Sequence, residues 1–324
     1  MSVRTERLAP VALAGLAVIT ALVLTSAPTV TPVSVERKGI PVGFPGAVAV
    51  IVVRGAMTDW IVADEAAVRF RNVPAYTRAS IDVSGNEVAG TTSDGLLMVS
   101  EWNRGDVLVA SDVDSFVWHE DAPGLLAWSS RGRVVMMNGR GLDQVVGVEG
   151  VLRLWGDVGF VTSDPGPGLG SRVYAESGAL EGELPGFVVG QLDGLPVITV
   201  GGPPAPPPGV ETATVVAGGG SIPWLPEDEL VRSFDLRDGA IAMVSSEGSI
   251  RAPRRLLIGL DGDFFDAGVV PTSRARPIWA GLHIVIAAHD GDGHEDVAVI
   301  DSVTREVSWL GVDADTVLDV AVTG

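Results

Sequence analysis

The sequence predicts an all-β chain beyond its first 45 residues, on three observations. After Gly46, no window has the apolar spacing of three and four residues that indicates an amphipathic helix. Short runs rich in valine, isoleucine and leucine recur between clusters of Gly, Asp, Asn and Pro, which is typical of strands joined by turns. The content of 41 glycines and 21 prolines also fits a fold with many turns.

Composition excludes several classes of function. The 324 residues are 46% hydrophobic, which is enough to form a full core. The formal net charge is -19, and such an acidic chain is not expected to bind the phosphate backbone of nucleic acid. Cysteine is absent, so disulfides, thiolate metal sites and cysteine nucleophiles are excluded.

The N-terminal region predicts export. Residues 8–27 carry no charge, and as a helix rising ~1.5 Å per residue they would span the ~30 Å hydrocarbon layer of a membrane. Arg4 and Arg7 precede this segment, as in a signal peptide or in an anchor whose C-terminal side faces outward. We expect residues 1–7 to form a short tail and residues 8–27 a transmembrane anchor, with a removed signal peptide as the alternative. The expected location is the cell membrane, single-pass and extracytoplasmic, or secreted if cleavage occurs.

Two segments follow the anchor. Residues 28–45 contain four prolines and little that could pack, so they are expected to form a semi-rigid spacer. Residues 46–324 form the expected β domain.

A repeat of about 40 residues runs through this domain. Each copy reads strand, short acidic or glycine turn, strand, Ser and Asp or Gly turn, strand. The copies begin at Ser80, Ser115, Val151, Phe187, Val231 and Ile278. Repeats of this length, each with three or four short strands, are the sequence signature of a β-propeller.

The two ends of the domain complete one further copy. Residues 317–324 look like the first strand of the repeat, and residues 47–73 hold three strands that lack a first one. Pairing them would close the ring and leave no open sheet edge. The sequence therefore predicts seven blades, with six or eight as alternatives. A β-sandwich followed by a second β domain, divided at the proline-rich residues 201–210, is the competing interpretation.

With these repeats, residues 46–324 resemble propeller proteins of the broad WD40-like, quinoprotein-like and FG-GAP-like type. The chain departs from the WD40 pattern, since Gly293-His294 is its only Gly-His pair and none of its eight tryptophans precedes an aspartate. The resemblance implies an architecture without implying one function, because propellers include binding modules and unrelated enzymes.

One turn is similar to the calcium loop of FG-GAP blades. In the run "DGDGHEDVAV" (290–299), Asp290, Asp292 and Asp296 match the third, fifth and ninth loop positions. The first position would be Ala288, so one carboxylate is lost, and calcium affinity falls with each charged ligand removed. An Asp-Gly hairpin turn is the favoured interpretation. We expect no cofactor beyond a weakly held Ca²⁺.

A cluster of cations is the second candidate site. Five arginines fall within 26 residues of an otherwise cation-poor chain: Arg251, Arg254, Arg255, Arg274 and Arg276. Arginine binds carboxylate and phosphate groups through a two-pronged fork, so these residues are candidate ligand contacts. Alternatively they pair with the nearby aspartates 261, 263 and 266 on a solvated rim.

No catalytic residue is predicted. The chain has no Gly-x-Ser-x-Gly motif, and its four histidines lack a zinc-type spacing. The sequence predicts a membrane-tethered extracytoplasmic propeller that binds an envelope protein or glycan as a binding or scaffold module. The alternatives are an exported propeller enzyme of quinoprotein, lyase or glycosidase type with its site in the central channel, or a structural subunit of a membrane complex.

Overall fold

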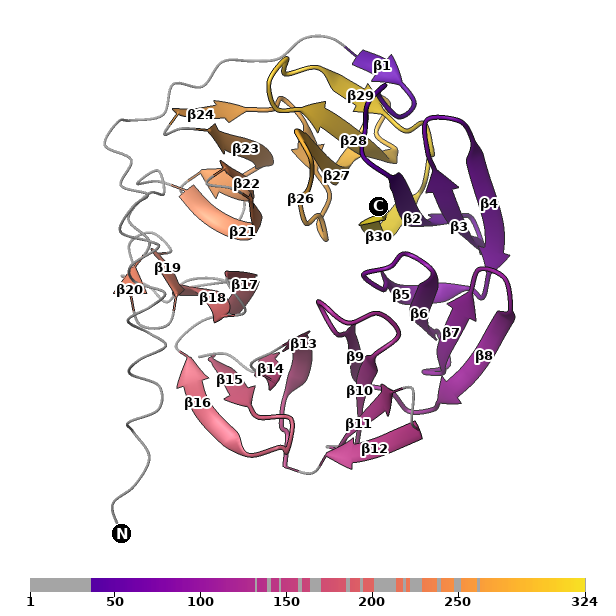
Figure 1. The fold of residues 1–324 in the computed structure, drawn as a ribbon, viewed down its shortest axis with the longest axis vertical. Coiled ribbons are helices and arrows are strands. Elements are labelled where there is room, and N and C mark those ends of the chain that lie inside the picture. The colour runs from indigo at the N-terminus through magenta and orange to yellow at the C-terminus, as the bar shows by residue number, and fades with distance from the viewer. Residues whose placement is uncertain are drawn as a thin grey trace.

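The fold is an all-β propeller, as predicted (Figure 1). The computed structural model describes residues 36–323, except 132, 139–140, 146, 157–158, 164–169, 185–186, 193–194, 201–213, 218–219, 222–228, 238–239, 248–251 and 261–262. Its strands form six four-stranded sheets and one six-stranded sheet around a ring.

Six of the sheets are regular four-stranded blades. The first joins β2 (Ala47–Arg54), β3 (Met57–Ala63) and β4 (Val68–Val73) to the last strand, β30 (Thr316–Thr323). The second has β5 (Tyr76–Ile81), β6 (Glu87–Thr92), β7 (Leu97–Glu101) and β8 (Gly105–Ala110). The third has β9 (Ser115–Trp118), β10 (Leu126–Ser130), β11 (Arg133–Asn138) and β12 (Gly141–Val145).

Three more blades continue around the ring. They are β13 (Val151–Gly156), β14 (Gly159–Ser163), β15 (Ser171–Tyr174) and β16 (Leu180–Leu184); then β17 (Phe187–Leu192), β18 (Leu195–Val200), β19 (Thr214–Ala217) and β20 (Gly220–Ser221); then β21 (Glu229–Arg237), β22 (Ala240–Glu247), β23 (Arg254–Leu260) and β24 (Asp263–Asp266). Strands within each blade are antiparallel neighbours, and the first strand lies nearest the ring centre (Figure 1).

The remaining sheet is larger. Strands β26 (Ile278–Ala280), β27 (His283–His289), β28 (Glu295–Asp301) and β29 (Val307–Trp309) pair in chain order. In addition, β25 (Val270–Pro271) pairs with β27, and β1 (Glu36–Lys38) runs parallel to β29 at the edge.

The ring closes as predicted. Strand β30 pairs antiparallel with β2, from Ala47 opposite Thr323 to Val53 opposite Thr316. The last strand therefore completes the first blade, and no edge is left open at this junction.

Ordered structure begins before Gly46, where the domain was expected to start. Strand β1 and Phe44, which is 5% exposed, both belong to the segment expected to be a spacer. Phe44 joins a cluster of buried apolar side chains that includes Val285 and Val297, so this part of the segment packs on the propeller. The rest of the expected spacer, residues 28–35, lies outside the described residues.

The predicted membrane span also lies outside them. No helix among the residues that the structure describes is long and apolar enough to cross a membrane, and residues 8–27 are not part of that set.

The hydrophobic core is divided among the interfaces between neighbouring sheets. One cluster lies between the blade of β2 and the six-stranded sheet, and another joins that sheet to the blade of β22. Strands covered on both faces are expected to be apolar almost throughout. Strand β27 shows this pattern, because its first six residues are all buried.

Hydrogen bonds also link the innermost strands. Asp319 in β30 accepts the Ile81 N–H of β5 at 2.8 Å, and the Trp118 indole of β9 donates to Ser80 O of β5 at 2.9 Å. On the other side of the ring, Asp235 accepts the Trp279 N–H at 2.8 Å. These bonds fix the spacing of the strands around the channel.

Candidate functional site

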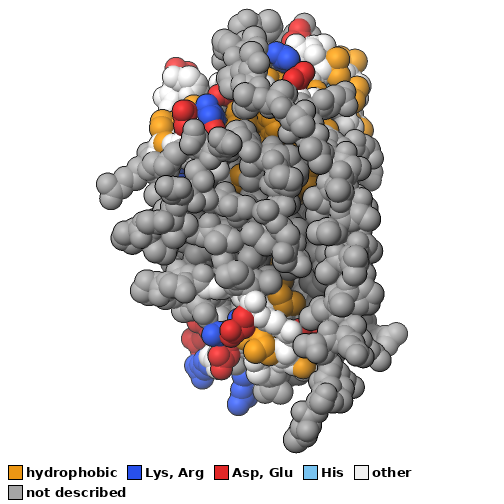
Figure 2. Space-filling model, turned by 90° about the vertical axis from the view of Figure 1, so that its left-hand side faces the viewer, with side chains coloured by type: hydrophobic (Ala, Val, Ile, Leu, Met, Phe, Trp, Pro, Cys, Tyr) orange, Lys and Arg blue, Asp and Glu red, His pale blue; other side chains and the backbone are white. Residues whose placement is uncertain are grey.

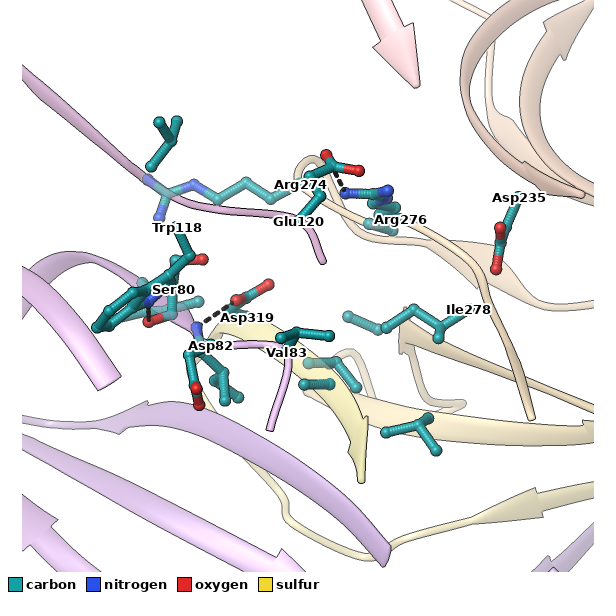
Figure 3. A pocket seen from close by; sticks show the side chains of 18 of the residues that line it. Ser80, Asp82, Val83, Trp118, Glu120, Asp235, Arg274, Arg276, Ile278 and Asp319 are labelled. Carbon is teal, nitrogen blue, oxygen red and sulfur yellow. Dashed lines mark hydrogen bonds and ion pairs between the residues drawn. The ribbon is translucent and has the colours of Figure 1, made fainter. Parts of the chain in front are cut away.

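A cavity of about 310 Å³ lies at the ring centre (Figure 3). Residues from β5, β9, β13, β21, β26 and β30, or from the turns next to them, line its wall. Strands far apart in sequence therefore contribute side chains to one space. Its charged lining residues are Asp82, Glu120, Arg153, Asp235, Arg274, Arg276 and Asp319.

Two of these acids accept hydrogen bonds from the backbone of their own or a neighbouring blade. Asp82 is 1% exposed, and its carboxylate accepts the Asn86 N–H at 3.0 Å and the Ser84 hydroxyl at 2.7 Å. Asp235 accepts the N–H groups of Leu236 and Trp279. Both carboxylates are used inside the fold, which reduces their capacity to bind a ligand.

Asp319 is the most perturbed of these acids. Partial removal from water raises its pKa to about 6, against the opposing effect of hydrogen bonds from Ile81 and Val320 N–H and from Ser80. The side chain comes from β30 and lies beside Asp82 and Ser80 in Figure 3. Near neutral pH this carboxyl can take up or release a proton.

Glu120 and His119 follow β9. Glu120 forms an ion pair with Arg276, with 3.5 Å between Oε1 and Nη1 (Figure 3). His119 Nδ1 accepts the N–H groups of Asp121 and Ala122, both at 3.2 Å, and its ring packs edge-on against Trp155. The ion pair of Glu120 holds its loop to the cavity wall, and the hydrogen bonds to Nδ1 fix the imidazole of His119 in a turn.

Three arginines approach the cavity from different elements. Arg153 of β13 and Arg274 before β26 line it, and Arg78 of β5 lies close enough to both that their charges contribute to lowering its pKa. Desolvation is the larger cause for Arg78, and it also lowers the pKa of Arg153. Arg78 donates to Asp114 O at 3.1 Å, and Arg153 Nε donates to Ser163 Oγ at 2.7 Å.

The five arginines singled out in the sequence do not form one group. Arg274 and Arg276 line the cavity, whereas Arg254 and Arg255 do not. Arg255 pairs with the buried Glu229 and lies 3.6 Å from Glu247, so the aspartates expected as rim partners are not its partners among the described residues. Arg251 lies outside the described residues.

The three aspartates of the calcium-like loop perform different roles. Asp290 Oδ1 accepts the N–H groups of Asp292 and His294, which is the pattern of a capped turn. Asp296 is 2% exposed and accepts the N–H groups of Val297, Gly311 and Val312. Among the described residues, no three His, Cys, Asp or Glu side chains gather into a metal-binding group. Calcium binding here stays a prediction.

Sequence reasoning missed Arg153, which lines the cavity, and Arg78, which lies near it. They are 75 positions apart in the printed numbering and meet only because β5 and β13 both face the ring centre. A usable signal existed, since both are charged residues within the first strand of a repeat, where apolar or small residues are the rule.

Comparisons with known proteins support the fold. No protein-family model and no curated protein matches the chain. Among solved structures, the β-propeller domain of the Trilobed protease from Pyrococcus furiosus is similar, with a TM-score of 0.54 and 14% identity, covering 84% of this chain and 100% of that one. An acylaminoacyl peptidase from Pyrococcus horikoshii has a TM-score of 0.54 and 12% identity over 82% of this chain. The present chain spans 53% of that peptidase.

These likenesses show a β-propeller and no more, given the low identity. The Trilobed protease domain is described as having an open velcro topology, whereas β30 pairs with β2 here. The C-terminal WD40 domain of Sif2 is also similar, at a TM-score of 0.45 and 13% identity, covering 91% of this chain and 90% of that one.

Proposed function

We propose that this chain is a binding module that holds its ligand at the central cavity. The six-stranded sheet counts as one blade in this proposal, which makes a ring of seven. The observation that carries it is a 310 Å³ cavity lined by charged side chains from six blades. Ligand sites are concave, few in number and equipped with a small set of convergent polar groups.

The proposal includes the cellular setting predicted from the sequence. Residues 8–27 would tether the propeller to the cell membrane, with the ring on the extracytoplasmic side and an envelope protein or glycan as partner. The support is the uncharged segment and the two arginines before it, Arg4 and Arg7. An exported binding module needs no disulfide when packing between many blades holds the fold.

An enzyme is the second candidate, and Asp319 favours it. A carboxyl group with a pKa near 6 is suited to general acid or base catalysis at neutral pH. A reaction also needs a nucleophile or a second acid-base group. The neighbouring candidates are engaged, because Glu120 pairs with Arg276 and His119 Nδ1 accepts two N–H groups. Binding is therefore the better-supported function.

Crosslinking in cells tests the binding function. A photoreactive residue replaces Val83 in the full chain, because Val83 lines the cavity and is 47% exposed. The control probe replaces Val303, which is 66% exposed in the turn between β28 and β29. A defined envelope protein or glycan joined through position 83 and absent at position 303 is the expected result. Equal capture from both positions, or none above background at position 83, would overturn the proposal.

A further inference from the structure

We propose that the central cavity binds an anionic group, a carboxylate or a phosphate, at the guanidinium groups of Arg153 and Arg274, which line it, with Arg78 next to them. This inference rests on the proposed binding function and names the chemical class of its ligand. The three side chains come from β5, β13 and the segment before β26.

Carboxylates of the described residues do not neutralise these three arginines. The chain has 41 acidic and 22 basic residues, so partners for arginine are abundant. Arginines outside the cavity use them: Arg71 lies 2.5 Å from Asp106, and Arg131 lies 2.6 Å from Asp112. On the face shown in Figure 2, basic and acidic side chains of described residues likewise lie side by side. Within the described part of the chain, Arg78, Arg153 and Arg274 have no carboxylate partner.

The acids that line the cavity already have other hydrogen-bond or ion-pair partners. Asp82 and Asp235 accept backbone N–H groups, and Asp319 accepts the Ile81 N–H. Glu120 is paired with Arg276. Among the described residues, none of these four carboxylates pairs with the three arginines, so an anion from outside would supply negative charge that the described lining does not.

Arg78 and Arg153 are held in position and still have N–H donors to offer. A guanidinium group carries five N–H donors, and each of the two anchored arginines spends few of them. Arg78 donates Nη1 to Asp114 O and lies over the Phe116 ring at 5.7 Å, while Arg153 donates Nε to Ser163 Oγ. These contacts hold both side chains in position and leave other donors for a ligand. Arginine forks match the planar oxygens of carboxylates and the oxygens of phosphates.

An anion would also relieve the repulsion between these arginines. Like charges that have partly left water repel one another, and this destabilises the charged forms. A bound oxyanion within hydrogen-bond reach replaces that repulsion with attraction, which is stronger inside a cavity than in bulk water. Binding should therefore raise stability and should weaken as salt is added.

Calorimetry on the full chain with three matched sugars tests the proposal. The probes are glucuronate, glucose 6-phosphate and neutral glucose, which separate a carboxylate source from a phosphate source on one scaffold. We expect at least one charged sugar to bind at millimolar concentration and glucose not to bind. The variant Arg274→Gln should weaken that binding about tenfold or more, the loss expected for charge-assisted hydrogen bonds.

Arg274→Gln is chosen because Arg274 is exposed and makes no hydrogen bond or ion pair within the described part of the chain. Its folding should be normal, which the melting temperature checks. Arg69→Gln is the matched control, since it removes the same charge from the outer strand β4, where Arg69 pairs with Asp64. Arg153→Gln is the second variant and should also weaken binding.

The outcomes separate the inference from the proposed function. Equal weakening by Arg274→Gln and Arg69→Gln would mean that net charge alone attracts the sugar, and the inference would be wrong. Binding of neither charged sugar, together with specific capture through position 83, would overturn the anion inference and leave the binding function intact. Failure of both experiments would overturn the binding function together with the anion inference.

Discussion

Asp319→Asn should make the stability of the propeller less dependent on pH. The substitution keeps the shape of the side chain and an oxygen that can accept the Ile81 N–H, while it removes the titrating proton. In the native chain the pKa of Asp319 is raised from 3.8 to about 6, so the folded state binds a proton that the unfolded state releases. This contribution to stability is fully present below the unfolded pKa and is lost as pH rises through the folded pKa.

The magnitude follows from those two pKa values. The gap between 3.8 and about 6 corresponds to about 3 kcal/mol over the whole titration, at about 1.4 kcal/mol for each tenfold change. Between about pH 5 and about pH 7.5, the part lost is about 1.4 kcal/mol. This is an upper figure, because Asp319 keeps part of its surface in the water of the channel.

Urea unfolding of the full chain, followed by tryptophan fluorescence, measures this loss. Wild type and Asp319→Asn are compared at both pH values, because other acids titrate in the same range and cancel in the difference. The wild type should lose up to about 1.4 kcal/mol more than the variant between the two pH values. Identical pH dependence in the two proteins would refute the raised pKa, and with it the case for Asp319 as an acid-base group.

Three further predictions concern other parts of the ring. Gly90→Ala places a Cβ 2.4 Å from the ring of the buried Tyr76, so it should lower the unfolding free energy by about 1–3 kcal/mol in a urea titration. The control Gly182→Ala adds a Cβ with nothing within 4 Å and should change the unfolding free energy by less than about 0.5 kcal/mol. The carboxylate of Asp296 accepts the N–H groups of Gly311 and the buried Val312 through different oxygens, so in Asp296→Asn the amide NH₂ must face one of these donors. The substitution should lower the unfolding free energy by about 1–3 kcal/mol, with or without calcium. Millimolar calcium should leave the melting temperature at its value in chelator; a rise that Asp296→Asn abolishes would instead establish the calcium loop.

The architecture was predictable because its signals are local. Each blade repeats the same order of strands and turns, so aligning copies located the ring without any contact information. Predicted copies at Ser115, Val151, Phe187 and Ile278 begin on the first residues of β9, β13, β17 and β26. The start of ordered structure was less predictable, because β1 pairs with β29 and Phe44 packs in the core, and local composition reveals neither contact.

The candidate site was only partly predictable, for the opposite reason. Arg274 and Arg276 stood out because they are close in sequence to other arginines, yet the residues that line the cavity with them belong mostly to other blades. Arg78 and Arg153 gave only the weak signal of a single charge within a strand. A site assembled from the first strands of many blades depends on ring geometry, and a window along the chain samples one strand at a time.

The pairing of β2 with β30 has a consequence for how the protein reaches its native state. Thr323 Oγ1 contacts Ala47 O across 276 positions of the chain, so one blade joins residues made near the start and near the end of this sequence. Until β30 is available, β2 presents an unpaired edge that could template association with another chain. Contacts of such long sequence separation form slowly. A chaperone that shields the β2 edge until β30 has been made would therefore protect the protein at its most vulnerable stage.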